Sequence, residues 1–346
     1  MIKVINSGIL SSFQDKGRYG QKKFGVSKSG SLDSFSFELA NRLTGNDIDE
    51  PCIETLGGLS CVFYIESIVS ITGPIEFFSV NNSFIYKTNS SIKLKSGDKL
   101  DIPIPQKGNI FYLSVSGGFK IDKILDSYSY HQPSNITNNF KISSGDEIEL
   151  NPTKQENLFV SETSFFEKKI FNNEKIKIIY NEESRSDKIK NLFENNEFTI
   201  SDQFSRQGIR LIGKPISIFK DQNEISSEVS PGTVQLPPNG QPIILLNDSQ
   251  TTGGYKKIGV IPRFELSKLS QKPISSRIKF SEISLSDSIS EFREMRTEFD
   301  NINIYNYINR VLEINGRLIS VQILENNSIM SISDNEQFDI IEENFE

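Results

Sequence analysis

Short apolar runs broken by glycine, serine and asparagine dominate this chain and constrain its fold more than any other feature. Runs of this kind, rich in Val, Ile, Phe and Tyr and bounded by turn residues, are typical of β-strands. Regular alternation of strands with helices, as in a doubly wound parallel sheet, is absent. We therefore expect a mainly β fold, β-rich α+β, with a few helices. The clearest runs are CVFYIESIVSITG (61–73), IKLKSGDKLDI (92–102), NIFYLSVSGGF (109–119), KIKIIY (175–180) and PIILLN (242–247).

The clearest helix signal is SLDSFSFELANRLTGN (31–46). Ser31 or Asp33 can cap this segment, which carries an apolar face. A shorter helix is predicted within 183–194, and one or two more within 286–312.

One short pattern occurs twice. The stretches LKSGDKLDI (94–102) and ISSGDEIEL (142–150) share Ser-Gly-Asp followed by alternating apolar residues, and ISSRIKFSEI (274–283) is a weaker version. Ser-Gly-Asp suits a tight turn that leads into a strand. The copies are either unrelated turns or equivalent corners of a barrel-like β unit.

Charge and hydropathy exclude several partners. The formal net charge is −7, and no basic stripe with interleaved aromatics is present, which argues against nucleic acid. No run approaches the ~18 apolar residues of a membrane helix, and the N-terminus lacks the apolar core of a signal peptide. We expect a cytoplasmic protein with no membrane association.

The cysteine and histidine counts limit the chemistry. Cys52 and Cys61 form neither a disulfide framework nor a zinc pattern, so we expect buried, reduced thiols. The single histidine, His131, lies in the polar stretch SYSYHQPSN and is expected at the surface or in a loop. A multi-histidine metal site is impossible, and no metal is predicted.

The first candidate site segment is SFQDKGRYGQKKFGVSKSGSLDS (12–34). Ser29 and Gly30 lie just before the predicted helix, whose first N–H groups attract anions, and Arg18 could clamp the same group. The alternative is a structural loop held by an Asp15–Arg18 ion pair.

The second candidate segment is ISDQFSRQGIRLIGKPI (200–216). In an extended strand Arg206 and Arg210 would share one face. Such a pair either binds an anion or lies on the surface.

The third candidate segment is LLNDSQTTGGYKKIGVIP (245–262). Polar residues follow a strand end, and Gly253 and Gly254 then permit close backbone approach. The spacing excludes a P-loop. The segment is a donor-rich loop, which suits either ligand binding or a turn between strands.

Several motifs in order resemble one known family. They are QDKGRYG (14–20), GVSKSGSLD (25–33), LANRLTGN (39–46), ETLGG (54–58), SRQGIRLIG (205–213) and VSPGTVQLPPNGQPIILLNDSQTTGGYKKIGVI (229–261). Over roughly residues 1–285 the chain resembles the biotin-dependent carboxyltransferase family, also called the allophanate hydrolase subunit 2 or KipA-like family. Within this family it resembles the C subunit of 5-oxoprolinase.

The resemblance implies a pair of cyclophilin-like β-barrel units. We expect them at residues 1–160 and 161–285, with strands that can be exchanged between them. A C-terminal helical and β extension is expected at 286–346.

The resemblance also implies a hydrolase subunit that is active only in a complex. The complex would open 5-oxoproline to glutamate with ATP, which this chain would share with a KipI-like B subunit and an A-like subunit. One alternative is a biotin-dependent carboxyltransferase subunit of the urea carboxylase type. Another is a non-catalytic KipA-like regulator that binds a KipI-like partner. No Met-Lys-Met acceptor is present, so no covalent biotin is expected on this chain.

Together the segments predict a site for a small-molecule substrate in which fixed donors stabilise negative charge on a carbonyl or phosphoryl oxygen. The predicted catalytic residues are Asp15, Arg18, Arg206, Asp248 and Thr252. The predicted substrate-binding residues are Ser29, Gly30, Arg210, Gln250, Thr251, Gly253, Gly254 and Tyr255.

The chain departs from the family pattern at several positions. Tyr128 stands where the family often has an arginine, and Ser205 and Gln207 replace an aspartate and a methionine around Arg206. An arginine contact to a substrate carboxylate near residue 128 is therefore not expected.

Overall fold

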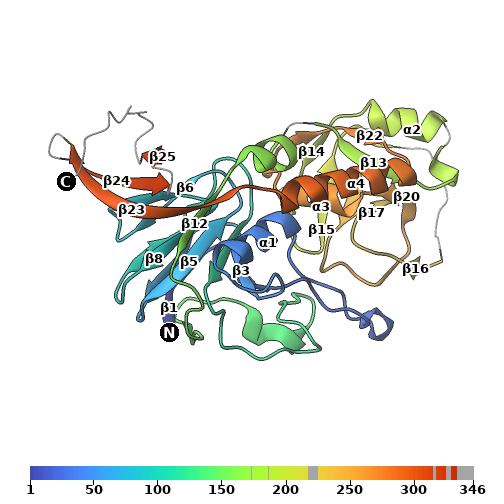
Figure 1. The fold of residues 1–346 in the computed structure, drawn as a ribbon. Coiled ribbons are helices and arrows are strands. Elements are labelled where there is room, and N and C mark those ends of the chain that lie inside the picture. The colour runs from blue at the N-terminus through green and yellow to red at the C-terminus, as the bar shows by residue number, and fades with distance from the viewer. Residues whose placement is uncertain (173, 186, 217–224, 315–316, 325–328, 333–346) are drawn as a thin grey trace.

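The fold is mainly β, as the apolar runs predict (Figure 1). A computed structural model describes residues 1–172, 174–185, 187–216, 225–314, 317–324 and 329–332. The strands form three large sheets and one two-stranded ribbon. The expectation of a β-rich fold with barrel-like units and few helices is confirmed.

The first unit consists of two sheets packed around one apolar core, which includes Val4, Phe63, Val69 and Leu113. The six-stranded sheet runs in the order β11 (Glu147–Ile148), β1 (Ile2–Ser7), β4 (Leu59–Phe63), β9 (Lys99–Asp101), β6 (Phe77–Val80) and β7 (Phe84–Lys87). The nine-stranded sheet runs β2 (Ser12–Gln14), β3 (Cys52–Thr55), β10 (Phe111–Val115), β5 (Ser67–Thr72), β8 (Ser90–Leu94), β12 (Leu158–Ser161), β23 (Ile304–Ile314), β24 (Arg317–Leu324) and β25 (Ile329–Ile332).

The second unit is a near-closed barrel built from one eight-stranded sheet. Its order is β21 (Arg277–Ile278), β14 (Phe198–Ile200), β15 (Gly208–Ile212), β18 (Ile243–Leu245), β17 (Thr233–Leu236), β20 (Lys256–Val260), β13 (Ile176–Tyr180) and β22 (Phe280–Glu282). The ribbon of β16 (Ser227–Glu228) and β19 (Thr252–Gly253) stands beside it. The chain passes from one unit to the other between β12 and β13; the domain limits predicted from the sequence stay a prediction.

Helix α1 (Ser34–Leu43) lies between the two units. Phe37 and Ala40 belong to the core that continues into the second unit. Phe35 and Leu39 pack in a separate cluster with Phe299 of α4 (Leu285–Asp300). Because α1 contributes to both clusters, it holds the two units in a fixed relation.

The remaining helical segments are short. They are α2 (Asp187–Glu194), α3 (Arg263–Ser270), the 3₁₀ turns η1 (Lys22–Phe24), η2 (Asn135–Phe140) and η4 (Glu183–Arg185), and the π-helical turn η3 (Phe166–Ile170). Helix α3 is not predicted by the sequence patterns. Every residue from Phe264 to Ser270 is buried, so the segment shows no exposed polar face by which an amphipathic helix is recognised.

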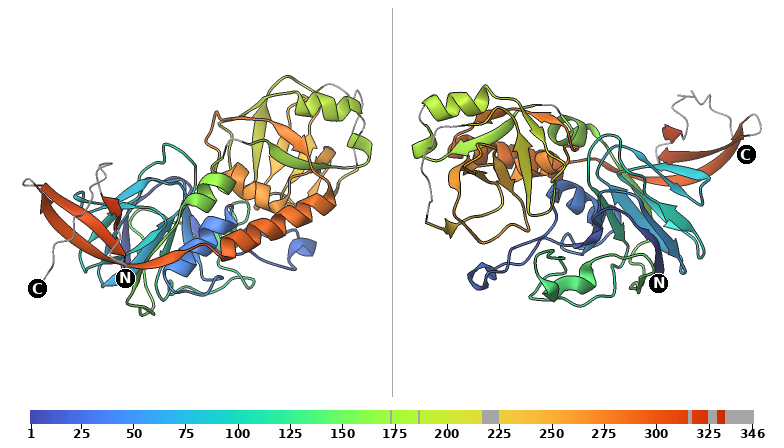
Figure 2. Two further views of the ribbon diagram at one scale, coloured as in Figure 1. Left: turned by 45° about the horizontal axis from the view of Figure 1, so that its top comes forward. Right: turned by 180° about the vertical axis from the view of Figure 1, so that it is seen from behind.

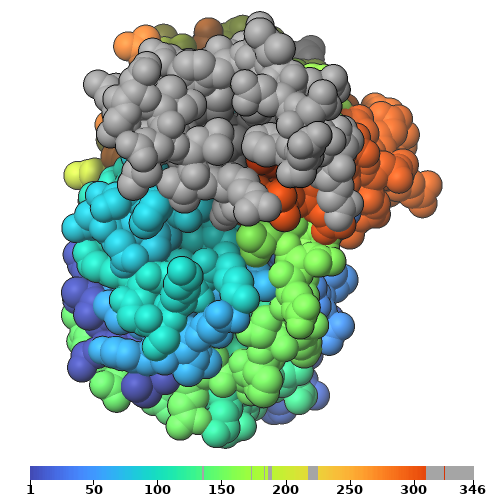
Figure 3. All heavy atoms as spheres, turned by 60° about the vertical axis from the view of Figure 1, so that its left-hand side comes forward, coloured from blue at the N-terminus to red at the C-terminus, as the bar shows by residue number. Residues whose placement is uncertain are grey.

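The tail differs in part from its prediction. Helix α4 ends at Asp300, and Ile304 begins strand β23, so residues 304–312 are not helical. Strand β23 pairs antiparallel with β12, and β12 pairs with β8. In Figure 2 the chain leaves α4 at the second unit and returns to the first. In Figure 3 the green atoms of the middle of the chain lie beside the blue and cyan atoms of the first unit, as the pairing of β12 with β8 requires. The extension therefore adds to the sheet of the first unit.

The two Ser-Gly-Asp turns are equivalent corners of the first unit. Gly97 and Gly145 have φ of 95° and 94°, and each is followed by an aspartate whose carboxylate accepts a backbone N–H three residues earlier at 2.7 Å. Each corner also exchanges two backbone hydrogen bonds with one strand residue, Phe63 for the first corner and Val4 for the second. The strands that follow, β9 and β11, pair with β4 and β1.

The weaker copy forms the same corner in the second unit. Ser275, with φ of 69°, takes the glycine's place, and Ser276 takes the aspartate's place. Ile200 exchanges the same pair of backbone hydrogen bonds with this corner. The Ile200 carbonyl accepts from the Ser275 N–H, and the Ile200 N–H donates to the Ser276 carbonyl. The interpretation of the echo as repeated barrel corners is confirmed in both units.

Within the part of the chain that the structure describes, no helix is both long enough and apolar enough to cross a membrane.

Candidate functional site

A buried charge cluster joins the two units. Arg206 lies in the turn before β15 and is 3% exposed. Its Nε donates to Asp248 Oδ2 at 3.0 Å and its Nη2 to Asp248 Oδ1 at 3.2 Å, while Nη1 pairs with Glu54 of β3. Burial alone would lower the pKa of Arg206, but Asp248 and Glu54 outweigh it and raise that pKa.

Further hydrogen bonds tie this cluster to the start of α1. Glu54 Oε2 accepts from the Leu32 N–H at 2.9 Å and from the Tyr112 hydroxyl at 2.7 Å. Burial, and then the Glu54 carboxylate, raise the pKa of Tyr112 well above its usual range, so the phenol stays a donor. Arg206 Nη2 also donates to the Gly30 carbonyl at 2.6 Å. The cluster thus fixes loop 29–32 against the second unit.

Asp15 fixes a second loop. Its carboxylate accepts from Ser127 Oγ at 2.8 Å, Ser129 Oγ at 2.5 Å, the Tyr128 N–H at 2.8 Å and the Gly17 N–H at 2.7 Å. The carboxylate therefore binds residues 127–129 to the loop that carries Arg18.

Arg18 is a buried cation with unused donors. Its side chain is 2% exposed, and Nη2 donates to the Ser129 carbonyl. Among the described residues, Nε and Nη1 have no hydrogen-bond partner. Burial lowers the pKa of Arg18, and the nearby Asp15 and Asp248 act in the opposite direction. A buried guanidinium with two unpartnered nitrogens, Nε and Nη1, is the kind of group that binds a carboxylate.

The loop Asp248–Tyr255 runs from this buried cluster to the surface. Asp248 is fully buried, and its N–H donates to the Arg206 carbonyl at 2.9 Å. Further along, Thr251, Gly253 and Gly254 are half-buried, while Gln250, Thr252 and Tyr255 are exposed. The loop therefore has a buried base at Asp248 and reaches the surface by Gln250.

The comparisons with known proteins identify the family of this chain. A family model described as the carboxyltransferase domain, subdomains A and B, matches residues 24–282. The chain belongs to this carboxyltransferase family.

Two relatives and one solved structure illustrate the range of the family. The chain is 30% identical over 309 residues to the C subunit of 5-oxoprolinase from Escherichia coli (strain K12), a match that spans 87% of this chain and 97% of the relative. It is 30% identical over 327 residues to urea amidolyase of Saccharomyces cerevisiae, spanning 84% of this chain but 17% of that protein. The crystal structure of K. lactis urea amidolyase superposes with a TM-score of 0.76 at 23% identity, covering 93% of this chain and 22% of that one.

Within this family member, the structure brings together part of the predicted site. Asp248 accepts hydrogen bonds from Arg206 and acts electrostatically on Arg18. Ser129 connects Asp15 to Arg18, because its hydroxyl donates to Asp15 and its carbonyl accepts from Arg18. The loop Asp248–Tyr255 joins them through Asp248. The roles assigned to these residues in catalysis and binding stay predictions.

Arg210 does not join them. Arg206 precedes β15 in a turn with Gly208 and is buried, whereas Arg210 lies on β15 and is exposed. The prediction that both arginines share one face of an extended strand is wrong, because the strand begins only at Gly208.

The start of α1 is not an open anion site. Asp33 is the N-cap, and its carboxylate accepts from the Phe35 and Ser36 N–H groups. The Ser34 N–H donates to Ser267 Oγ at 3.2 Å. Ser29 is fully buried with φ of 54°, and its hydroxyl has no partner among the described residues. The predicted anion binding by the helix N-terminus is wrong, because protein groups already accept from these N–H donors.

His131 is buried rather than exposed. It is 4% exposed, and its Nε2 lies 3.2 Å from Ser27 Oγ, which in turn donates to the Ser249 carbonyl. Its Nδ1 has no partner within the described part of the chain. Burial lowers the pKa of His131. A polar sequence context suggested an exposed loop, but the loop is covered by segments more than 100 positions away.

Glu54 and Tyr112 are site residues that the sequence patterns did not single out. Glu54 lies in the quoted ETLGG motif, which was a usable signal, whereas Tyr112 lies in an ordinary apolar strand and offered none. No group of three or more His, Cys, Asp or Glu side chains suited to a metal occurs within the described ranges.

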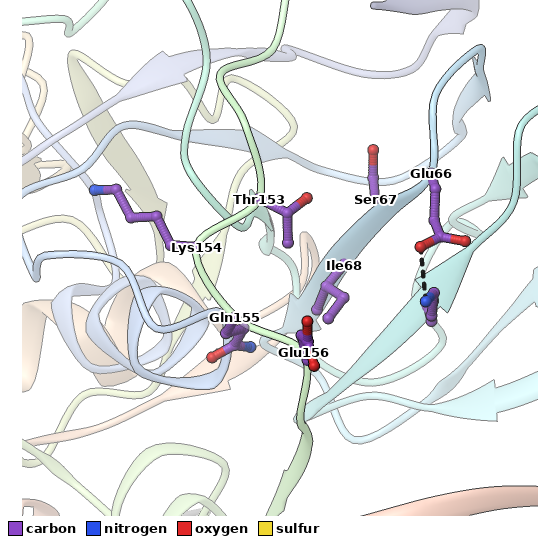
Figure 4. A pocket seen from close by; sticks show the side chains of 8 residues that line it. Glu66, Ser67, Ile68, Thr153, Lys154, Gln155 and Glu156 are labelled. Atoms are coloured by element: carbon purple, nitrogen blue, oxygen red, sulfur yellow. Dashed lines mark ion pairs between the residues drawn. The ribbon is translucent and has the colours of Figure 1, made fainter.

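A hollow on the first unit lies apart from this site. It is bordered by β5, β8 and the segment 153–156 (Figure 4). Its main charges, Glu66 and Lys93, pair with each other at 2.7 Å, and we assign it no function.

Proposed function

We propose that this protein is the C subunit of an ATP-dependent 5-oxoprolinase, which acts with a KipI-like B subunit and an A-like subunit to convert 5-oxoproline to glutamate. The similarity to the Escherichia coli C subunit supports this, because the match spans nearly the whole of both chains. A second C subunit, from Haemophilus influenzae, is 28% identical over 87% of this chain and 97% of its own length.

The observation that carries the proposal is the buried guanidinium of Arg18. Its Nε and Nη1 lack partners within the described residues. The substrate 5-oxoproline is a cyclic amide that also bears a carboxylate, so it supplies the anion that this cation lacks. Urea is neutral and supplies none, whereas carboxybiotin, the other substrate of a carboxyltransferase, also bears a carboxylate.

The remaining parts of the site suit amide opening. Negative charge that develops on the amide oxygen needs fixed donors. We assign this role to the Thr251 and Thr252 hydroxyls and the Gly253 and Gly254 N–H groups, whose loop is held at its base by the buried Arg206–Asp248 pair. ATP would activate the amide oxygen, and we place its binding on the assembled complex, since the chain carries no P-loop.

Reconstitution tests the proposal. This chain would be purified with the A-like and B-like subunits of the same genome, and glutamate formed from 5-oxoproline and ATP would be measured. Turnover should require all three subunits. A complete mixture that forms a stable complex but releases no glutamate would exclude this function.

A carboxyltransferase subunit is the second candidate, favoured by 30% identity to yeast urea amidolyase across most of this chain. It would act on carboxybiotin and urea with a biotin carboxylase partner. The matched assay replaces 5-oxoproline with urea, bicarbonate and a biotin carboxylase with its carrier, and measures urea-dependent phosphate release. If the chain binds a KipI-like protein but neither mixture is active, the result supports the third alternative, a non-catalytic KipA-like regulator.

A further inference from the structure

Four large apolar side chains form a projecting surface beside the outer end of the candidate site. Tyr19 and Phe24, in the loop that contains η1, are 58% and 71% exposed. Ile225, which precedes β16, is 92% exposed, and Tyr255, which follows β19, is 46% exposed. Soluble proteins expose few contiguous apolar groups, so such a group marks a contact with another molecule.

Hydrogen bonds bring the two parts of this projecting surface together. Lys22 Nζ donates to Glu228 Oε1 at 3.3 Å and to the Val229 carbonyl at 3.1 Å, which joins the η1 loop to the ribbon of β16 and β19. Within the ribbon Ser227 pairs with Gly253, and this antiparallel register continues toward the exposed residues at its end. In Figure 1 the blue loop with η1 stands out from the body on the same side as β16.

The segments that carry the projecting surface are positively charged. Residues 16–32 contain five Lys or Arg side chains, residues 249–264 contain three, and neither segment contains an Asp or Glu. The whole chain has a formal net charge of −7, so these cations are gathered against the average of the chain. A binding partner that complements this charge presents acidic groups.

Each exposed ring of the η1 loop has an ammonium group over it. Lys23 Nζ lies 5.0 Å from the centroid of the Phe24 ring, and Lys28 Nζ lies 4.6 Å from that of Tyr19. Within the described part of the chain, neither lysine forms an ion pair. A molecule that covers the rings also takes water from these cations, and a carboxylate is the group that compensates for that loss.

We propose that the projecting surface docks a partner protein whose contact face has an apolar hollow bordered by Asp and Glu side chains. A phosphate group or a nucleic acid would use the lysines but leave Ile225 without a contact, whereas aromatic and apolar anchors with a charged rim are typical of protein interfaces. Strand β19 belongs to the loop Asp248–Tyr255, so the docked partner covers the outer end of that loop and excludes water from it. The identification of this partner as the B-like subunit rests on the proposed function.

Binding of the full chain to the purified B-like subunit tests the proposal, measured by calorimetry without substrate or ATP. Phe24→Ala should raise Kd about tenfold or more, as expected for an aromatic anchor, and should keep the wild-type melting temperature because the ring is exposed. Phe77→Ala is the matched control, since Phe77 is an exposed ring on β6, which lies at the opposite end of the molecule from β16 in Figure 1. The control should leave Kd unchanged.

Salt tests the acidic character of the partner. The Kd of the wild-type chain should rise severalfold between ~0.05 and ~0.3 M NaCl, because exposed charges are screened over this range. Lys23→Glu should raise Kd at low salt and flatten the salt dependence. A wild-type Kd that does not change with salt would overturn the assignment of an acidic contact face.

Equal Kd values for wild type and Phe24→Ala, or no binding of the wild-type chain, would overturn the proposal. A dimer of the chain alone in sedimentation that Phe24→Ala dissociates would do the same, because a second copy would then occupy the surface. Glutamate release by the complete mixture judges the proposed function separately. Release with normal binding by Phe24→Ala keeps the function and excludes the docking surface, whereas binding that depends on Phe24 without release keeps the surface and excludes the function.

Discussion

Glu54 of the first unit and Arg206 of the second form an ion pair buried between them, with side-chain exposures of 5% and 4%. Asp248 holds the same guanidinium through two hydrogen bonds. The pair therefore links the junction of the two units to the base of the loop Asp248–Tyr255.

Loss of Arg206 should destabilise the whole protein. In Arg206→Met, two carboxylates stay buried without a cation, which is expected to lower the free energy of unfolding by about 3–5 kcal/mol. Chemical denaturation of the purified chain measures this. Arg277→Met is the control, because Arg277 pairs with Glu197 at 3.3 Å on the surface, and it should cost less than ~1 kcal/mol. Similar losses in both variants would contradict the role of the buried cluster.

Loss of Arg18 should affect substrate binding more than stability. In Arg18→Met the complex loses its carboxylate clamp, and KM for 5-oxoproline is expected to rise roughly 10- to 100-fold, the range for a hydrogen bond to a charged group. The unfolding free energy should change little, because the guanidinium bonds only to the Ser129 carbonyl among the described residues. Steady-state kinetics and denaturation together check this. An unchanged KM beside a large loss of stability would make Arg18 structural.

His131 should make stability depend on pH. Burial holds its folded-state pKa below the unfolded value, so the unfolded chain binds the proton first as pH falls. The contribution of neutral His131 is then complete above about pH 6.5 and is lost as pH falls toward the folded-state pKa. Because the chain has one histidine, the difference between wild type and His131→Gln isolates this effect. The unfolding free energies of wild type and His131→Gln, measured at pH 7.5 and at pH 5, should converge at the lower pH. A difference between the two proteins that stays the same at both pH values would argue against this role of His131.

Both cysteines should resist thiol reagents in the folded protein. Burial raises the pKa of Cys61 to about 12 and raises that of Cys52 further above its usual range. The thiolate is the reactive form, so labelling at neutral pH should be slow until the chain unfolds, when both residues react. Mass spectrometry after iodoacetamide treatment, with and without denaturant, measures this. Rapid labelling of either cysteine in the native state would show that its segment opens readily.

Local patterns predicted most strands because side-chain alternation and turn chemistry act over a few residues. They failed where packing overrides local pattern. Helix α3 is covered on all sides, so its sequence lacks a polar stripe. Residues 304–312 follow a helical segment without a strong stop signal, yet they extend a sheet whose nearest strand, β12, lies far back in the chain. The edge of an existing sheet supplied the partners that made this segment a strand.

The sequence by itself determined the local structural features of this protein, which are the turns at the repeated corners and the Asp33 helix cap. It also determined the ordered motifs that mark the family. Only the tertiary structure decided which polar groups are paired. Asp15 accepts from Ser127 and Ser129, more than 100 positions away, instead of pairing with Arg18, and this leaves Arg18 buried with idle donors. The physical reason is that burial removes water from a charge, and the partner that replaces the water is selected by how distant strands and loops meet.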